Sequence, residues 1–134
     1  MKFEEINVGL TYECKHTIIS STVLEFAKIS GDNNPIHIND EYAKNSIFKQ
    51  RIVHGMFVGS FFSRAIASEL PGPGSIYLNQ TMNFLKPIYH NSEVRICIKV
   101  ESLKPEKKIV FLSTNCWVSD SLVIEGTAIV KCLE

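Results

Sequence analysis

The cysteines of this sequence do not occur in closely spaced pairs. The four cysteines among the 134 residues are too far apart to form a C-x-x-C motif, which excludes a zinc knuckle and a thioredoxin-type redox site. A secreted domain stabilised by disulfides would be shorter or richer in cysteine. We therefore expect reduced cysteines in the core, at Cys14, Cys97, Cys116 and Cys132.

An excess of charge of one sign is also absent. The sequence has 14 basic and 14 acidic residues, so it offers no basic surface for nucleic acid or for a membrane. The densest basic stretch, residues 104–108, contains Pro105 and Glu106 and is predicted to be a turn. We expect neither nucleic acid nor a membrane as a partner.

The sequence has no long hydrophobic run. The apolar stretch at 56–70 is interrupted by serine, arginine and glutamate and is too short and too polar to cross a bilayer. The first five residues contain no apolar signal segment. These features predict a cytoplasmic protein.

The pattern along the chain changes near Leu70, from mixed helical segments to repeated strands. The expected strands are residues 11–19, 75–85, 93–103, 108–118 and 122–132. The first expected helix begins near Thr22 and Glu25, which have capping-box spacing, and ends at Gly31. A helical turn at 40–45 and a longer helix at 55–69 are expected to follow. The polar segment 32–39, which contains Pro35, is predicted to be a loop.

Apolar residues occur almost all round the expected helix at 55–69, which predicts a buried helix. The gaps between the last three strands are short, so these strands should pair as antiparallel hairpins. A long antiparallel sheet wrapped around one buried helix is an α+β fold of the hot-dog type. The length favours a single domain that spans residues 1–134.

The polar segment after the first helix carries the candidate chemistry. Asp32 and His37 are five residues apart, and loops on a rigid scaffold are where catalytic groups concentrate. Pro35 restricts this loop, and Asn33 and Asn34 can hydrogen-bond to its backbone. The loop is thus suited to hold a carboxylate and an imidazole toward one point.

Each of these residues also has a purely structural interpretation. Asp32 and Asn34 could simply turn the chain after a helix, and His37 could be an ordinary loop histidine. A metal site is not expected, because the calcium-loop pattern lacks its Gly and terminal Glu here and the spacing of His37 and His54 matches no standard zinc motif. His54 is interpreted as a structural residue at the start of the longer helix.

Three blocks of the sequence resemble one known family. The run 30–37 resembles the motif S-G-D-x-N-P-x-H of MaoC-like (R)-specific enoyl-CoA hydratases, with matches at Ser30, Gly31, Asp32, Asn34, Pro35 and His37. The blocks R-I-V-H-G-M at 51–56 and L-P-G-P-G-S-I-Y-L at 70–78 resemble the same family, in its order and spacing. Relatives often have a glycine before the arginine, where this chain has Gln50. The resemblance covers nearly the whole chain.

The resemblance implies an activity and a set of roles. Asp32 and His37 would activate one water, the Gly55 N–H at the start of the helix would bind the thioester oxygen, and Ser63 would lie near the same pocket, with Asn34 also among the substrate-binding residues. The reaction would be the reversible hydration of a trans-2-enoyl-CoA to an (R)-3-hydroxyacyl-CoA, with no metal or cofactor. The bulk of Ile66 suggests a short to medium acyl chain. A homodimer or a dimer of dimers is expected, because the sheet would otherwise expose its edges.

Three other functions compete with this one. A dehydratase that acts on acyl-carrier-protein thioesters would use the same chemistry. A hot-dog thioesterase would need a carboxylate on the central helix, and this helix carries only Glu69, at its far end. A non-catalytic acyl-CoA-binding module would need neither Asp32 nor His37, so the presence of both favours an enzyme.

Overall fold

The computed structural model describes residues 1–134, with five strands in one antiparallel sheet of order β1-β3-β4-β5-β2. The strands are β1 (Thr11–Thr17), β2 (Ser75–Phe84), β3 (Glu93–Lys104), β4 (Ile109–Val118) and β5 (Ser121–Cys132). The helices are α1 (Ser20–Ser30), α2 (Pro35–Ile38), α3 (Asp40–Lys44) and α4 (Gly55–Ser68), with 3-10 turns η1 (Phe3–Glu5) and η2 (Pro105–Lys107). The predicted α+β class and its five strands are confirmed.

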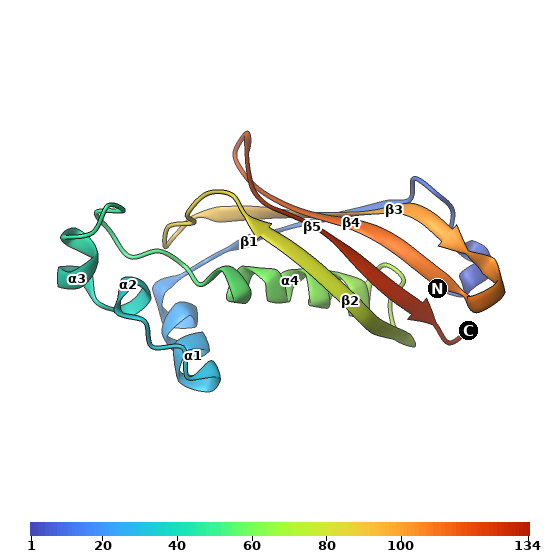
Figure 1. The fold of residues 1–134 in the computed structure, drawn as a ribbon, viewed down its shortest axis with the longest axis horizontal. Helices are drawn as coiled ribbons and strands as arrows, with labels where there is room; N and C mark the ends of the chain where they lie inside the picture. The colour runs from blue at the N-terminus through green and yellow to red at the C-terminus, as the bar shows by residue number, and fades with distance from the viewer.

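Figure 1 shows α4 running along one face of the sheet, while α1, α2 and α3 gather beyond one end of it. Both chain termini lie at the opposite end, where the Phe3 N–H donates to the Glu134 carbonyl oxygen at 3.0 Å. The helical segment that carries the candidate chemistry therefore lies at the end of the sheet from which α4 begins. None of the helices has the length and apolar character needed to cross a membrane.

The interior strands β3, β4 and β5 supply about half of the core. Side chains of β3 and β4 alternate between buried and more exposed, as expected for a sheet with one covered face. The buried partners across these strands include Ile96 with Cys116 and Val100 with Leu112. All four cysteines are free, and Cys116 and Cys132 lie in the core as predicted, whereas Cys14 and Cys97 are only partly buried.

The central helix α4 is buried on one side only. Val58, Phe62, Ala65 and Ile66 face the core at the spacing of a single helical face. Met56 is 60% exposed, and Ser60 and Ser63 are also exposed. The prediction of a helix buried all round is therefore wrong, because within one chain the sheet and the Phe26 ring of α1 leave the side of α4 with Met56, Ser60 and Ser63 uncovered.

Helix α4 approaches strand β2 very closely through two glycines. A Cβ atom on Gly55 would lie 2.5 Å from Phe84 Cε1, and one on Gly59 would lie 2.7 Å from Met82 Sδ. Both distances are below any normal contact between carbon or sulfur atoms. Glycine at these positions, one turn apart, lets the edge strand pack directly against the helix backbone.

Two local predictions are corrected. The expected loop at 32–39 contains the short helix α2, because the Asn34 side chain accepts from the Ile36 N–H at 3.3 Å and Pro35 occupies the first helical turn, a combination that starts helices. The capping box of Thr22 and Glu25 does not form, since α1 already begins at Ser20 and the Thr22 hydroxyl donates to the Ile19 carbonyl oxygen. Gly31 ends α1 in the left-handed conformation, at φ 80°, as predicted.

Candidate functional site

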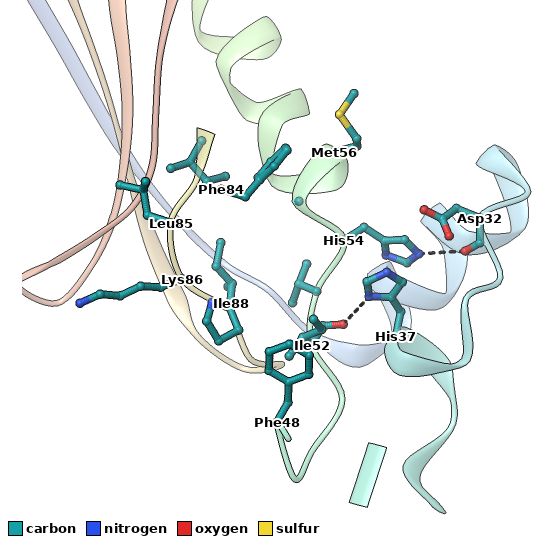
Figure 2. Close-up of a pocket in the computed structure, with 14 residues that line it drawn as sticks. Asp32, His37, Phe48, Ile52, His54, Met56, Phe84, Leu85, Lys86 and Ile88 are labelled. Carbon is teal, nitrogen blue, oxygen red and sulfur yellow. Dashed lines mark hydrogen bonds between the residues drawn. The ribbon is translucent and has the colours of Figure 1, made fainter. Parts of the chain in front are cut away.

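A pocket of about 390 Å³ opens at the N-terminal end of α4. Asp32, His37 and His54 form its polar side, and Figure 2 shows these three residues close together. Apolar side chains form most of the remaining wall, mainly from the end of β2, the segment that follows it and β5: Phe84, Leu85, Pro87, Ile88 and Ile124. Lys86 also lines the pocket. An apolar pocket with a few convergent polar groups is the usual form of a small-molecule site.

The local fold brings Asp32 and His37 to this pocket. Gly31 reverses the chain after α1, and the Asp32 carboxylate then accepts from the Asn34 N–H at 3.4 Å. Pro35 starts α2, which carries His37 in its last turn. The carboxylate thus lies before a helix and the imidazole on it, rather than both on one irregular loop.

The ring of His37 is fixed by a main-chain hydrogen bond. His37 Nδ1 lies 2.9 Å from the Ile52 carbonyl oxygen, which can only accept, so Nδ1 carries the proton and Nε2 remains an acceptor. Burial lowers the pKa of His37, and His54 lowers it further, against the opposing effects of the Ile52 hydrogen bond and of Asp32. The imidazole is therefore largely neutral at pH 7 and is suited to take up a proton.

His54 is the buried member of the group, with 1% of its surface exposed. Its Nε2 lies 2.9 Å from the Asp32 carbonyl oxygen, and its ring stacks on that of His37 with 3.9 Å between centroids and 26° between planes. Phe26 contacts it edge-on at 4.8 Å. His54 was expected to be a structural residue at the start of the longer helix. Its contact with His37 was not predicted.

One polar atom from each of Asp32, His37 and His54 lies within 4.8 Å of the others, which raises the question of a metal ion. A metal must lie near the plane of each imidazole, about 2.0–2.1 Å from its nitrogen. The stacked rings of His37 and His54 direct their lone pairs along nearly parallel planes, so the lone pairs do not converge. His54 Nε2 carries the proton that it donates to the Asp32 carbonyl oxygen, so the lone pair of His54 is on Nδ1, which is buried. The geometry does not fit a shared metal.

Of the other predicted site residues, only Gly55 lines the pocket. It stands at the first position of α4, where a backbone N–H has no acceptor within the helix. Ser63 lies two turns further along, in a neighbouring groove between α4 and β2 that shares only Met56 with the pocket. Asn34 is exposed, and its side chain caps α2.

Much of the apolar wall was not predicted from the sequence. Phe48 and Ile88 line the pocket, yet they lie outside all the expected strands and helices, and Leu85 was expected only as the last residue of a strand. A sequence signal does exist in F-L-K-P-I, residues 84–88, because apolar residues on both sides of a proline after an exposed strand are unusual for a solvated turn.

Comparisons with known proteins agree with one another. The sequence model of the family described as MaoC like domain matches residues 3–120. The chain is 42% identical to the (R)-specific enoyl-CoA hydratase of Rhodospirillum rubrum over 128 residues, which cover 96% of this chain and 89% of that one. It is 40% identical to the 3-hydroxybutyryl-CoA dehydratase of Methylorubrum extorquens, over 96% of this chain and 82% of the other.

The same similarity extends to three dimensions. The solved structure of the (R)-hydratase from A. caviae, described as involved in PHA biosynthesis, superposes with a TM-score of 0.94 at 34% identity, over 96% of this chain and 98% of that one. This agreement confirms the hot-dog arrangement expected from the sequence.

Proposed function

The chain belongs to the MaoC-like domain family, and we propose that it hydrates trans-2-enoyl-CoA to (R)-3-hydroxyacyl-CoA, reversibly and as a single domain. It is a hydro-lyase, like the relatives it resembles. The observation that carries the proposal is the meeting of Asp32, His37 and the N-terminus of α4 in one pocket. The apolar wall suits the acyl chain, and the polar side suits the water that must be added.

Asp32 and His37 can hold one water between them. A water molecule can bridge two polar atoms that are 4.8 Å apart or less, because each of its hydrogen bonds spans about 2.8 Å. The water oxygen adds to C3 of the substrate while one water proton passes to the pair, and the pair then returns a proton to C2. His37 Nε2, free as an acceptor, is the group we assign to this transfer.

The charge that develops during this addition lies on the thioester oxygen. The N–H of Gly55, at the positive end of α4, is the donor that we assign to it. Such a donor contributes on the order of 3 kcal/mol to the stability of a comparable transition state. Since the water is held on one side of the planar substrate, addition from that side produces one enantiomer.

The test is to supply purified protein with crotonyl-CoA and follow the loss of the enoyl absorbance. The product is then offered separately to dehydrogenases specific for (R)- and (S)-3-hydroxybutyryl-CoA. We expect hydration and oxidation by the (R)-specific enzyme alone. Oxidation by the (S)-specific enzyme alone would contradict the assignment.

The same assay separates the alternatives. Preference for crotonyl thioesters of acyl-carrier protein over crotonyl-CoA would indicate the acyl-carrier-protein dehydratase. Failure with both substrates, together with measurable binding, would indicate a non-catalytic module. The short to medium chain length stays a prediction, and a substrate series from four to twelve carbons tests it. The cytoplasmic location also stays a prediction, which cell fractionation tests.

We further propose that two copies associate through strand β2. This strand is at the edge of the sheet and exposes large apolar side chains along its length, namely Ile76, Tyr77, Leu78, Phe84 and, just beyond it, Leu85. Edge strands that remain exposed are usually short or charged, so this one is suited to pair with a second copy. Met56, exposed on α4, adds to the same surface.

Light scattering at micromolar concentration should give the mass of a dimer or of a dimer of dimers. The variant Leu78→Lys places a charge on the edge and should shift the mass toward the monomer. The matched variant Leu24→Lys changes an exposed leucine on α1 and should leave the mass unchanged. A fully active monomer in the wild type would contradict the proposal.

A further inference from the structure

His54 lies between the parts of the site that do chemistry and belongs to none of them. It is the residue before Gly55 and forms the N-cap of α4, with no side-chain cap bond to the helix. Its ring points instead toward Asp32 and His37 (Figure 2). A residue that served only to start the helix would gain nothing from this direction.

The hydrogen bond from His54 holds the loop at Asp32, which is itself one of the two proposed catalytic residues. The Asp32 carbonyl oxygen can only accept, so His54 Nε2 carries the proton and donates across 2.9 Å. Asp32 is otherwise exposed, and its remaining hydrogen bonds are to Ser30, the last residue of α1, and to Asn34. The His54 donor thus ties the Asp32 main chain to the start of α4.

The stacked contact orients His37. The Ile52 carbonyl oxygen fixes one edge of the His37 ring, but one hydrogen bond still permits the ring to tilt about that edge. The face of His54, 3.9 Å away at 26°, restricts this tilt, and Phe26 of α1 in turn contacts the His54 ring edge-on. Ile52 and His54 belong to one short segment, so both restraints on His37 come from the chain that leads into α4.

We infer that His54 is a positioning residue, which holds Asp32 and His37 at a fixed separation from each other and from the N–H of Gly55. This inference rests on the proposed hydratase function. It assigns His54 no contact with substrate and no proton transfer. A change of about 1 Å in such a geometry can reduce a rate by as much as a hundredfold, so the effect of losing His54 should be large although His54 does no chemistry.

Two substitutions separate the two contacts. His54→Phe keeps a stacked ring but removes the donor to the Asp32 carbonyl. His54→Gln keeps an N–H donor but removes the stacked ring. In each variant we expect kcat on crotonyl-CoA to fall roughly tenfold or more while KM changes little. A loss in only one variant would assign the positioning to the contact that this variant lacks.

Leu112→Ala provides the control for destabilisation alone, because Leu112 is buried in β4, in the sheet core, and does not line the pocket. Its kcat per folded molecule should equal that of the wild type. If the His54 variants lost activity only in proportion to their unfolded fraction, as a purely structural role would require, the inference would be wrong.

A second readout does not depend on turnover. Asp32 and His54 are the titratable groups that face His37, with opposite effects on its pKa, and the Ile52 carbonyl is its hydrogen-bond partner. Removal of His54 in His54→Gln should therefore raise the pKa of His37 in a nitrogen NMR titration and move the acid limb of the kcat profile to higher pH. An unchanged His37 signal and titration would overturn the inference, even if the wild type proved inactive on crotonyl-CoA. An inactive wild type in which the His37 titration did move would instead contradict only the proposed function.

Discussion

The segment that carries the candidate chemistry and the sheet that supports it are held in place by different forces. Between residues 31 and 55, only Ala43, Val53 and His54 are buried. From Val94 to Val100 on β3 and from Val110 to Cys116 on β4, by contrast, every second side chain is buried. The first segment depends on hydrogen bonds and ring contacts, and the sheet depends on apolar burial. Activity and stability should therefore respond to different substitutions.

The largest effect should come from the chemical segment. Asp32→Asn retains the shape of the side chain but cannot take up a proton, and His37→Ala removes the imidazole, so each should lower kcat by roughly a hundredfold or more. Because neither side chain is part of the core, the thermal midpoint should change by only a few degrees. Steady-state kinetics on crotonyl-CoA gives kcat, and thermal unfolding followed by circular dichroism gives the midpoint. Near-normal kcat in either variant would show that the mechanism is wrong.

The sheet should show the opposite behaviour. Leu112→Ala leaves a cavity in the core, since Leu112 is 1% exposed, and should reduce the free energy of unfolding by about 2–5 kcal/mol. The matched Leu133→Ala, at a leucine that is 60% exposed, should have almost no effect. Urea denaturation gives both values. A fall in kcat of the folded Leu112→Ala protein would contradict the expectation that substitutions in the sheet affect stability and not activity.

Gly55 ends the chemical segment and also contacts Phe84 of the sheet. Its substitution therefore tests the contact between the two regions. The new Cβ of Gly55→Ala would clash with Phe84, and such overpacking costs about 1–3 kcal/mol. The double variant Gly55→Ala/Phe84→Ala removes the clash and should unfold no more easily than Phe84→Ala alone. If the double variant showed the cost of Gly55→Ala in full, the close contact with Phe84 would not be the reason for glycine here.

The smallest effect concerns pH. Because burial lowers the pKa of His37, kcat/KM should stay constant down to pH values below the usual 6.5 and fall only in more acid solution. As pH falls, the unfolded chain takes up protons at His16, His37 and His90 at a higher pH than the folded chain, since the pKa of each is lowered in the fold. Stability should therefore decrease as pH falls below about 6.5.

A pH–rate profile and denaturation at several pH values test these two statements. A kcat/KM that already declined between pH 8 and pH 7 would mean that His37 is not held in its neutral form.

The sheet could be predicted from the sequence because its signals are local. Alternation of apolar residues and short turns locates β3, β4 and β5 to within a few residues. Gly31 likewise predicts the end of α1, because its position requires a left-handed backbone. The short helix α2 was missed, since the proline was interpreted as a signal for a loop and not as the first residue of a helix.

The site could be predicted only in part. Asp32 and His37 are close in sequence, so their meeting is a local event. The contact of His54 with both of them joins residues 22 and 17 positions apart, and no periodicity reports it. The close approach of Phe84 to Gly55 is equally non-local. One face of α4 is exposed because no other element of the chain packs against it, and the composition of the helix does not show how many elements surround it.

The central claim is that Asp32 and His37 deliver one water from one side of the substrate. Hydration of crotonyl-CoA in D2O, stopped at low conversion, tests this claim directly, because proton NMR of the product gives the relative configuration at C2 and C3. We expect a single product with the (R) configuration at C3 and with deuterium and the hydroxyl group added from the same face. Anti addition, or a mixture of configurations at C2, would contradict delivery of both groups by one pair of residues.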